Sequence, residues 1–184
     1  DFQIKEAAER IKKSKNPIII SGGGVFYSNS MEELSNFAIK HNIPVTQTVM
    51  GYSTMKRDHS HYAGQIGGLG GKNTNDLAKE TDLAIAVGTK LADFTTGSWA
   101  NFENENFKLV SINVSRFDAN KHLAQAVVGD AKVSLIELSK ALGDWKAGDE
   151  WNEKSQRELK IWNDRIDKES APTNQEVPSY AQVI

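Results

Sequence analysis

The sequence has 184 residues, of which 39% are hydrophobic and 25% are charged, with a formal net charge of −2. A chain of this length can bury its own core, and the weak negative charge provides no basic surface, so neither nucleic acid nor a membrane is an expected partner. The absence of cysteine excludes disulfides, zinc-thiolate sites and cysteine nucleophiles. No apolar run approaches the roughly 20 residues that span a bilayer, and no signal-peptide pattern is present, so we expect a cytoplasmic protein.

The two ends of the sequence favour a piece of a longer polypeptide. The first residue is not methionine, and the last five residues, Tyr180 to Ile184, are mostly apolar and typical of the start of another element. We therefore expect an excised fragment, with a processed mature protein as the alternative.

The first part of the chain alternates helical and strand patterns. Apolar residues at helical spacing predict an amphipathic helix over residues 3–14. The run Ile18 to Ile20 is apolar on both faces, as a central parallel strand is. Gly22 to Gly24 then form a turn into a second helix, which begins with Ser30 and has Glu33 at the spacing of a capping box. The buried stripe expected for that helix is Met31, Leu34, Phe37 and Ala38.

The middle of the chain predicts two strands separated by a long loop. His41 to Pro44 ends the second helix, and Val45 to Val49 is typical of a strand. Residues 50–72 form the expected loop, because their many glycines indicate turns or a close approach of the backbone to a ligand or a neighbouring chain. A helix is predicted over residues 73–80, and Leu83 to Val87 is the clearest strand of the sequence.

The last third of the predicted domain contains two more strands. They cover residues 107–114 and 126–128 and follow a loop from Gly88 to Gly97. Asp130 is placed to cap a final helix, whose expected buried residues are Val133, Ile136, Leu138 and Leu142. This alternation predicts an α/β fold with a doubly wound, mainly parallel sheet and right-handed crossovers, a Rossmann-like three-layer α/β/α arrangement.

The domain is expected to occupy residues 1–143. Of the remaining residues, 144–184, the stretch 145–168 is strongly charged, with tryptophan, leucine and isoleucine interspersed, and residues 171–178 have the composition of a linker. They predict a charged peripheral helix and a linker towards a missing C-terminal domain.

The turn after the first strand partly matches the dinucleotide fingerprint G-x-G-x-x-G. Gly22 and Gly24 fit that pattern, but Tyr27 occupies the position of the third glycine, and no acidic residue ends the second strand. We favour a tight structural turn, and a nucleotide contact is the alternative.

Polar residues also follow the clearest strand, and open α/β sheets bind ligands outside the carboxyl ends of their strands. These residues are Asp93, Thr95, Thr96 and Ser98. A loop packed against another domain is the alternative that we favour. His59 and His61 are expected to be solvated loop residues rather than metal ligands. Because no acid–base pair, triad or metal cluster can be assembled, we do not expect catalysis by this segment alone.

Five sequence segments are informative through their order and spacing: Pro17 to Gly24, Ile43 to Val45, Gly64 to Gly71, Asp82 to Lys90, and Asp118-Ala with Gly129 to Ala131. Together they resemble the central domain of thiamine-diphosphate enzymes of the acetolactate synthase type. The resemblance implies a non-catalytic domain whose partners are the N- and C-terminal domains of the same chain. Those two domains would bind thiamine diphosphate and Mg²⁺, and the full-length enzyme would be a homo-oligomer.

Three further phrases, Val87 to Ser98, Ile112 to Val114 and Asp118 to His122, are most similar to the hydrolases of myo-inositol catabolism within this family. That likeness implies that the full-length enzyme hydrolyses a C–C bond and opens a cyclic trihydroxy-dione. The family's catalytic glutamate and metal-binding signature belong to the other two domains, so we assign no catalytic and no metal-binding residue here.

The sequence departs from the acetolactate synthases where they bind FAD. Gly68 to Gly70 replaces their Met-His-Gly, and Lys90 to Phe94 replaces a run with two arginines. FAD is therefore not expected, nor any other cofactor on the fragment. The candidates for a vestigial nucleotide pocket are Gly22, Gly23, Gly24, Asp93, Thr95 and Thr96. The alternatives are an FAD-binding central domain of a carboligase and a stand-alone nucleotide-binding module.

Overall fold

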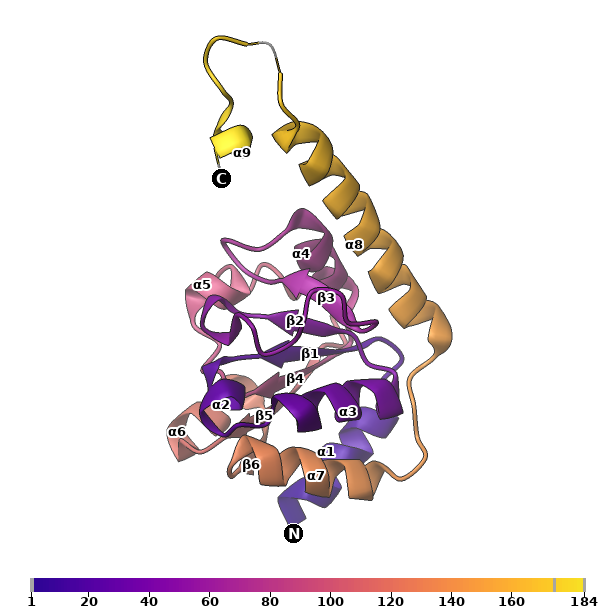
Figure 1. Cartoon of the computed structure of the whole chain (residues 1–184). Coiled ribbons are helices and arrows are strands. Elements are labelled where there is room, and N and C mark those ends of the chain that lie inside the picture. The colour runs from indigo at the N-terminus through magenta and orange to yellow at the C-terminus, as the bar shows by residue number, and fades with distance from the viewer. Residues whose placement is uncertain (1, 174, 184) are drawn as a thin grey trace.

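The computed structural model describes residues 2–173 and 175–183 and contains one all-parallel sheet (Figure 1). The order of its strands is β3-β2-β1-β4-β5-β6, the order of the doubly wound dinucleotide-binding fold. The predicted α/β class is thereby confirmed. The strands are β1 (Pro17–Ser21), β2 (Val45–Gln47), β3 (Tyr62–Gln65), β4 (Leu83–Val87), β5 (Lys108–Asn113) and β6 (Gln125–Val128).

Helices cover both faces of the sheet (Figure 1). The α-helices are α1 (Phe2–Lys12), α2 (Gly23–Tyr27), α3 (Met31–His41), α4 (Lys72–Glu80), α5 (Asp93–Thr96), α6 (Arg116–Ala119), α7 (Ala131–Leu142), α8 (Asp149–Ser170) and α9 (Tyr180–Val183). Two short 3₁₀ turns are η1 (Val49–Gly51) and η2 (Lys121–Leu123). None of the described helices has an apolar stretch long enough to cross a membrane.

The alternation of side chains along β1 divides the core into two layers. Successive residues of a strand point to opposite faces, so a central strand needs apolar residues at every position. Ile19 packs with the buried residues of α1, α3 and α7, while Ile18 and Ile20 pack with those of α4 and α8. This explains why the run Ile18 to Ile20 predicted a central strand correctly.

Several local predictions are confirmed. Helix α1 buries Ile4, Ala7, Ala8 and Ile11, as the helical spacing indicated. The carboxylate of Asp130 caps α7 by accepting hydrogen bonds from the backbone N–H groups of Lys132 (2.9 Å) and Val133 (3.3 Å). Asn42 ends α3 in the left-handed conformation, with φ of 54°.

Two side-chain predictions are wrong. Ser30 and Glu33 form no capping box: the Ser30 hydroxyl donates to the carbonyl oxygen of Val25 (3.1 Å), and Glu33 pairs with Lys132 of α7 (2.9 Å). On α7 itself, Val133 is 60% exposed and Ile136 is 38% exposed, whereas the buried apolar face consists of Ala131, Leu135, Leu138 and Leu142.

The region between β2 and α4 also differs from the prediction. The second strand stops at Gln47, because Thr48 caps the turn η1: its hydroxyl accepts from the backbone N–H of Gly51 (3.0 Å). The expected loop over residues 50–72 contains strand β3. The short helix α5 likewise lies within the loop expected from Gly88 to Gly97.

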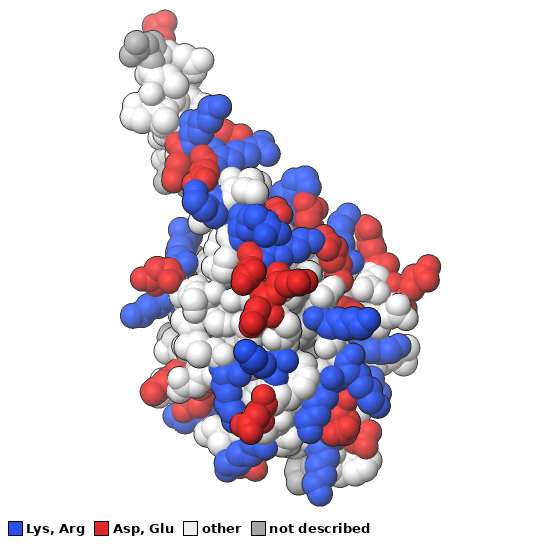
Figure 2. All heavy atoms as spheres, turned by 90° about the vertical axis from the view of Figure 1, so that its right-hand side faces the viewer, with Lys and Arg blue, Asp and Glu red and all other residues white. Residues whose placement is uncertain are grey.

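Helix α8 is the predicted charged peripheral helix, and its buried residues, Trp151, Ser155 and Leu159, all lie in its first half. Trp151 donates its indole N–H to the carbonyl oxygen of Pro17 (2.8 Å), and Gln156 donates to that of Tyr62 (2.9 Å). The second half projects away from the sheet (Figure 1), and Figure 2 shows both signs of charge interspersed over this face. The predicted linker and the apolar C-terminal phrase include residues 174 and 184, which lie outside the described residues.

His41 ties the end of α3 to the segment after α7. It is fully buried, and its Nδ1–H donates to the carbonyl oxygen of Trp145 (2.7 Å), because a carbonyl can only accept. Its Nε2 therefore accepts from the Ser139 hydroxyl (3.0 Å). Burial lowers the pKa of His41 below its ordinary value, so the ring is neutral in the folded protein.

Acidification is expected to destabilise the fold. Since the folded-state pKa of His41 is lowered, the unfolded chain takes up a proton first, and stability present above about pH 6.5 is lost as the pH falls through the lowered value. Urea unfolding at about pH 7.5 and about pH 5.5 measures this loss. His41→Gln should show a smaller loss, the remainder arising from the other three histidines, His59, His61 and His122, whose pKa values burial also lowers. An unchanged pH dependence in this variant would contradict the assignment.

Candidate functional site

The carboxyl ends of β1 and β4 form the switch point of the sheet. The chain proceeds from β1 to β2 on one side and later places β4 on the other side of β1. Ligands of open α/β sheets bind in the crevice that such a reversal creates. In this protein, the crevice is bordered by the turn Gly22 to Gly24, the turn after β2 and the loop that starts at Gly88.

Glycine backbones pack directly against each other at the base of the crevice. The N–H of Gly22 donates to the carbonyl oxygen of Val87 (2.9 Å), and that of Gly24 donates to the carbonyl oxygen of Gly88 (2.9 Å). A Cβ on Gly24 would lie 2.6 Å from the Cα of Gly88, closer than Cβ atoms approach in proteins. Glycine is therefore required at these positions by the close approach of the two backbones. The N–H of Gly24 already donates to Gly88 and so is not free to bind a ligand.

A cavity of about 490 Å³ lies above this contact, within the size range of small-molecule sites. Among the described residues that line it, Lys90 alone is charged, and the polar side chains are those of Thr48, Thr89, Thr95 and Asn113 together with the Tyr27 hydroxyl. A second cavity of about 310 Å³ shares Gly24, Tyr27, Gly88 and Asn113 with the first.

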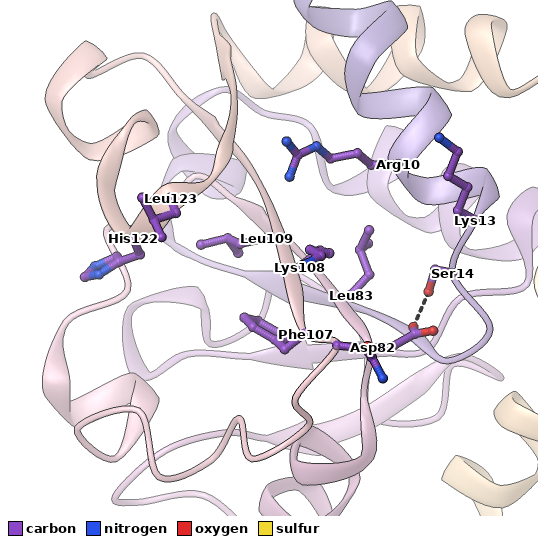
Figure 3. A pocket seen from close by; sticks show the side chains of 11 residues that line it. Arg10, Lys13, Ser14, Asp82, Leu83, Phe107, Lys108, Leu109, His122 and Leu123 are labelled. Carbon is purple, nitrogen blue, oxygen red and sulfur yellow. Dashed lines mark hydrogen bonds between the residues drawn. The ribbon is translucent and has the colours of Figure 1, made fainter.

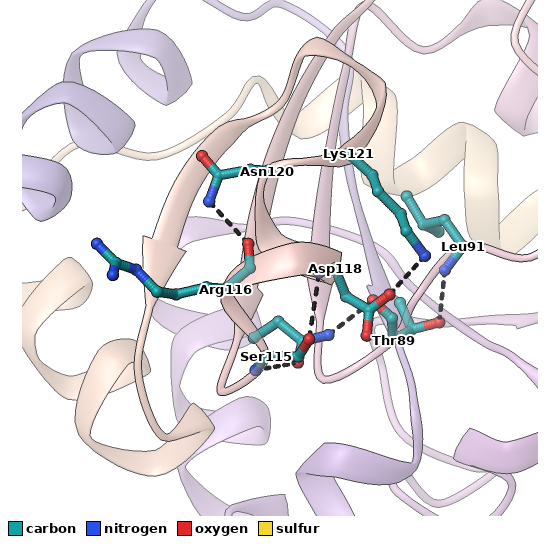
Figure 4. A network of polar contacts seen from close by, with 8 residues as sticks. Thr89, Leu91, Ser115, Arg116, Asp118, Asn120 and Lys121 are labelled. Carbon is teal, nitrogen blue, oxygen red and sulfur yellow. Dashed lines mark hydrogen bonds and ion pairs between the residues drawn. The ribbon is translucent and has the colours of Figure 1, made fainter.

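Asn113, the last residue of β5, holds two of the loops at this edge in place, and Figure 4 shows Thr89 and Ser115 of these two loops. Its side-chain amide donates to the carbonyl oxygen of Thr89 (3.2 Å), and its side-chain oxygen accepts from the N–H of Ser115 (2.9 Å). In the same network, the ammonium of Lys121 binds the carboxylate of Asp118 (2.6 Å) and holds its pKa below the ordinary value. The loops after β4 and β5 are thus cross-linked.

The structure brings together half of the residues predicted from the sequence for this site. Gly23, Gly24 and Thr95 line the cavity of about 490 Å³. Gly22 lies beneath it, and Asp93 is exposed at the start of α5. Thr96 is fully buried, and its hydroxyl accepts a hydrogen bond from the N–H of Trp99 (3.2 Å).

Several residues that line the cavity were not predicted. Thr48 and Thr89 follow β2 and β4 within two residues, and Asn113 ends β5. A search of the last two residues of each predicted strand and of the positions just after it would have found them, because parallel strands end at the same edge. The exposed apolar rings of Tyr27 and Phe94 line the same cavity.

The two loop histidines have structural partners. His59 shares a hydrogen bond with the Ser35 hydroxyl (2.9 Å), and Nε2 of His61 is 3.0 Å from Oδ1 of Asn42. His61 is only 8% exposed, so the prediction that both histidines are solvated is wrong for this one. Within the part of the chain that the structure describes, no group of three or more histidine, cysteine, aspartate or glutamate side chains could hold a metal ion.

The fold and the site define a Rossmann-like α/β domain with a glycine turn at its switch point. The chain belongs to the family described as the central domain of thiamine pyrophosphate enzymes, whose model matches residues 4–138. Thiamine pyrophosphate is another name for thiamine diphosphate, so the resemblance inferred from the sequence is confirmed.

Its curated relatives include ring-dione hydrolases. The chain is 44% identical over 135 residues to 3D-(3,5/4)-trihydroxycyclohexane-1,2-dione hydrolase 2 of Bacillus cereus (strain ZK / E33L), covering 73% of this chain and 21% of that protein. It is 44% identical over 140 residues to the hydrolase of Clostridium perfringens (strain 13 / Type A), covering 76% and 22%. For the hydrolase of Bacillus anthracis, the identity is 43% over 135 residues, with 73% and 21% covered. The chain thus spans about a fifth of the length of these relatives.

Proposed function

We propose that this chain is the non-catalytic central domain of a thiamine-diphosphate-dependent hydrolase of myo-inositol catabolism, which opens a cyclic trihydroxy-dione by cleaving a C–C bond. The observation that carries the proposal is the 44% identity with ring-dione hydrolases over 135 residues, nearly the whole α/β domain. We place the boundary of that domain after residue 143, between α7 and α8.

Thiamine diphosphate and Mg²⁺ belong, in this proposal, to the domains before and after this one. The donor set supports that assignment, because among the described residues no carboxylate or histidine cluster fits Mg²⁺. We therefore assign no step of the reaction to a residue of this chain. Its role is to position the two cofactor-binding domains of the same polypeptide within a homo-oligomer.

The carboxyl edge of the sheet offers the contact surface for those domains. Single exposed apolar residues are ordinary, but a set of them on one edge marks an interaction site. The loops that follow the first five strands each present such side chains, between 40% and 81% exposed: Phe26, Tyr27, Val49, Met50, Tyr52, Leu69, Phe94, Val114 and Phe117.

A measurement of cofactor binding distinguishes a non-catalytic central domain from one that contains the cofactor site. Calorimetric titration of thiamine diphosphate with Mg²⁺ into this chain should give no binding heat, whereas the intact gene product should bind the cofactor. Saturable binding by the chain alone would contradict the non-catalytic role, because the cofactor site would then lie within it.

The alternative is a flavin-binding central domain of a carboligase, and the cavity of about 490 Å³ is the place where a nucleotide would bind. Lys90 is the one cation among its described lining residues, which leaves an anionic diphosphate with few donors. We expect the purified intact protein to lack flavin absorbance near 450 nm and its melting temperature to stay unchanged on addition of FAD. Stoichiometric flavin absorbance would favour the carboligase.

A further inference from the structure

A third cavity lies at the opposite edge of the sheet, at the amino ends of β4 and β5. Its volume is about 580 Å³, within the range of small-molecule sites. Figure 3 shows Arg10 of α1 and Lys13, which directly follows α1, on one side and His122 and Leu123 on the other, with Lys108 between them. Because it lies away from the switch point, this cavity is independent of the proposed function.

The cations around this cavity form no ion pair with any residue that the structure describes. Among the described residues, no ion pair and no side-chain hydrogen bond involves the charged groups of Arg10, Lys13 or Lys108. The acid in the lining is Asp82, and its carboxylate is already engaged. It accepts hydrogen bonds from the Ser14 hydroxyl and from the backbone N–H groups of residues 15 (2.8 Å) and 16 (3.0 Å).

The negative end of the α1 macrodipole does not account for all of this charge. Basic residues are favourable in and just after the last turn of a helix, which would explain Arg10 in that turn and Lys13 directly after it. Lys108, however, begins strand β5 and brings a third positive charge to the same cavity from a different element. Lys12, also in the last turn of α1, pairs instead with Glu9 (3.4 Å). Three cations without an ion-pair partner among the described residues therefore converge from α1, from the residue after it and from β5, which favours an anionic ligand.

The rest of the lining is apolar. Leu83 and Leu109 are buried at the base of the cavity, and the ring of Phe107 is half-buried. At the edge, His122 and Leu123 have φ values of 60° and 58°, a left-handed conformation that is strained for a bulky residue such as leucine. The strained turn leaves Leu123 97% exposed beside the cations, while the ring of His122 lies against Trp99, with 4.3 Å between ring centroids.

We propose that this cavity binds a small amphipathic anion, a carboxylate or phosphate group carried on an apolar body. The head group would contact Arg10, Lys13 and Lys108, and the apolar body would cover Leu109, Phe107 and the side chain of Leu123. Burial of the exposed Leu123 side chain by the ligand would offset part of the strain of its turn.

Titration calorimetry with octanoate and octyl phosphate tests the proposal. At least one of them should bind one site per chain, and the stronger ligand identifies the head group. Octanol, which lacks the charge, and acetate and inorganic phosphate, which lack the apolar body, should each bind at least about tenfold more weakly. Affinity should also fall with added salt, since the head group is held by exposed cations.

Matched variants locate the site. The double variant Arg10→Gln with Lys108→Gln should weaken binding of the stronger ligand by about tenfold or more, and Leu123→Glu should do the same by placing a negative charge at the edge. The control, Lys5→Gln with Lys168→Gln, removes two exposed cations elsewhere and should change affinity by less than about twofold. The substituted side chains are exposed, except for the half-buried Arg10, so melting temperatures should change little.

Absence of binding by both octanoate and octyl phosphate would overturn the proposal. Equal weakening by the double variant and its control would also overturn it, because the anion would then respond only to net charge. Octanol binding as tightly as octanoate would show that the cations play no part.

Discussion

Gly88→Ala is expected to lower the free energy of unfolding by about 3 kcal/mol. The added Cβ would lie 2.5 Å from the Cα of Gly24, a backbone atom that cannot move aside as the end of a side chain can. Gly88 also has φ of +61°, where alanine is strained whatever the space. Both effects act at the base of the switch point, where β1 and β4 meet.

Gly148→Ala is the matched control for this substitution. Gly148 precedes α8 with φ of −61°, and an added Cβ would meet nothing within 4 Å, so we expect a change within about 0.5 kcal/mol. Urea unfolding followed by circular dichroism measures both variants. A Gly88→Ala protein as stable as the Gly148→Ala protein would show that the two loops do not pack as closely as described.

Trp151→Ala should cost about 3–5 kcal/mol of unfolding free energy. Trp151 is 5% exposed, packs with the core layer under α4, and donates its indole N–H to the Pro17 carbonyl oxygen. Its removal leaves both a void and an unpaired buried carbonyl group at the start of β1. Helix α8 should consequently detach from the sheet, with a loss of helical signal before the main unfolding transition.

Two further variants separate the parts of this effect. Trp151→Phe keeps most of the ring but not the N–H, and should cost about 1–3 kcal/mol for the unpaired carbonyl group. Ile161→Ala, in the projecting half of α8 where the side chain is 57% exposed, should change stability by less than about 1 kcal/mol. Equal effects of Trp151→Ala and Ile161→Ala would mean that α8 does not dock through its first half.

The strands that the sequence predicted are those whose burial can be seen in the residue pattern. β1 and β4 are runs of Ile, Ala, Leu and Val, because both faces of a central parallel strand are covered by helices. β3, with the sequence Tyr-Ala-Gly-Gln, has no β-branched residue, and its Gly64 has φ of +105°. It becomes a strand through pairing with β2 and cover from α8, which local pattern does not reveal.

The buried face of a helix and the partners of its side chains were harder to predict, because both depend on contacts between distant parts of the chain. Helix α7 has apolar residues on adjacent faces, and only the position of α1 and α3 decides that Leu135 is buried and Val133 is not. Ser30 and Glu33 have the spacing of a capping box, but Lys132 of α7 binds Glu33 instead. Such contacts join residues about a hundred positions apart and leave no mark in the local sequence.

The sequence predicted where the candidate site lies in the fold, but not which side chains face it. The carboxyl ends of β1 and β4 are evident from the sequence, and Gly23, Gly24 and Thr95 lie there as expected. Asp93 and Thr96 belong to the single-turn helix α5, whose orientation depends on contacts with the rest of the fold. For that reason, one faces solvent and the other faces the interior.

Assay of the intact gene product tests the central claim most directly. It should be incubated with 3D-(3,5/4)-trihydroxycyclohexane-1,2-dione, thiamine diphosphate and Mg²⁺, beside this chain alone under the same conditions. We predict ring opening by the intact protein and none by the chain. Inactivity of the intact protein on the dione, together with carboligation of pyruvate, would contradict the proposed function and place the chain in an acetolactate synthase-like enzyme.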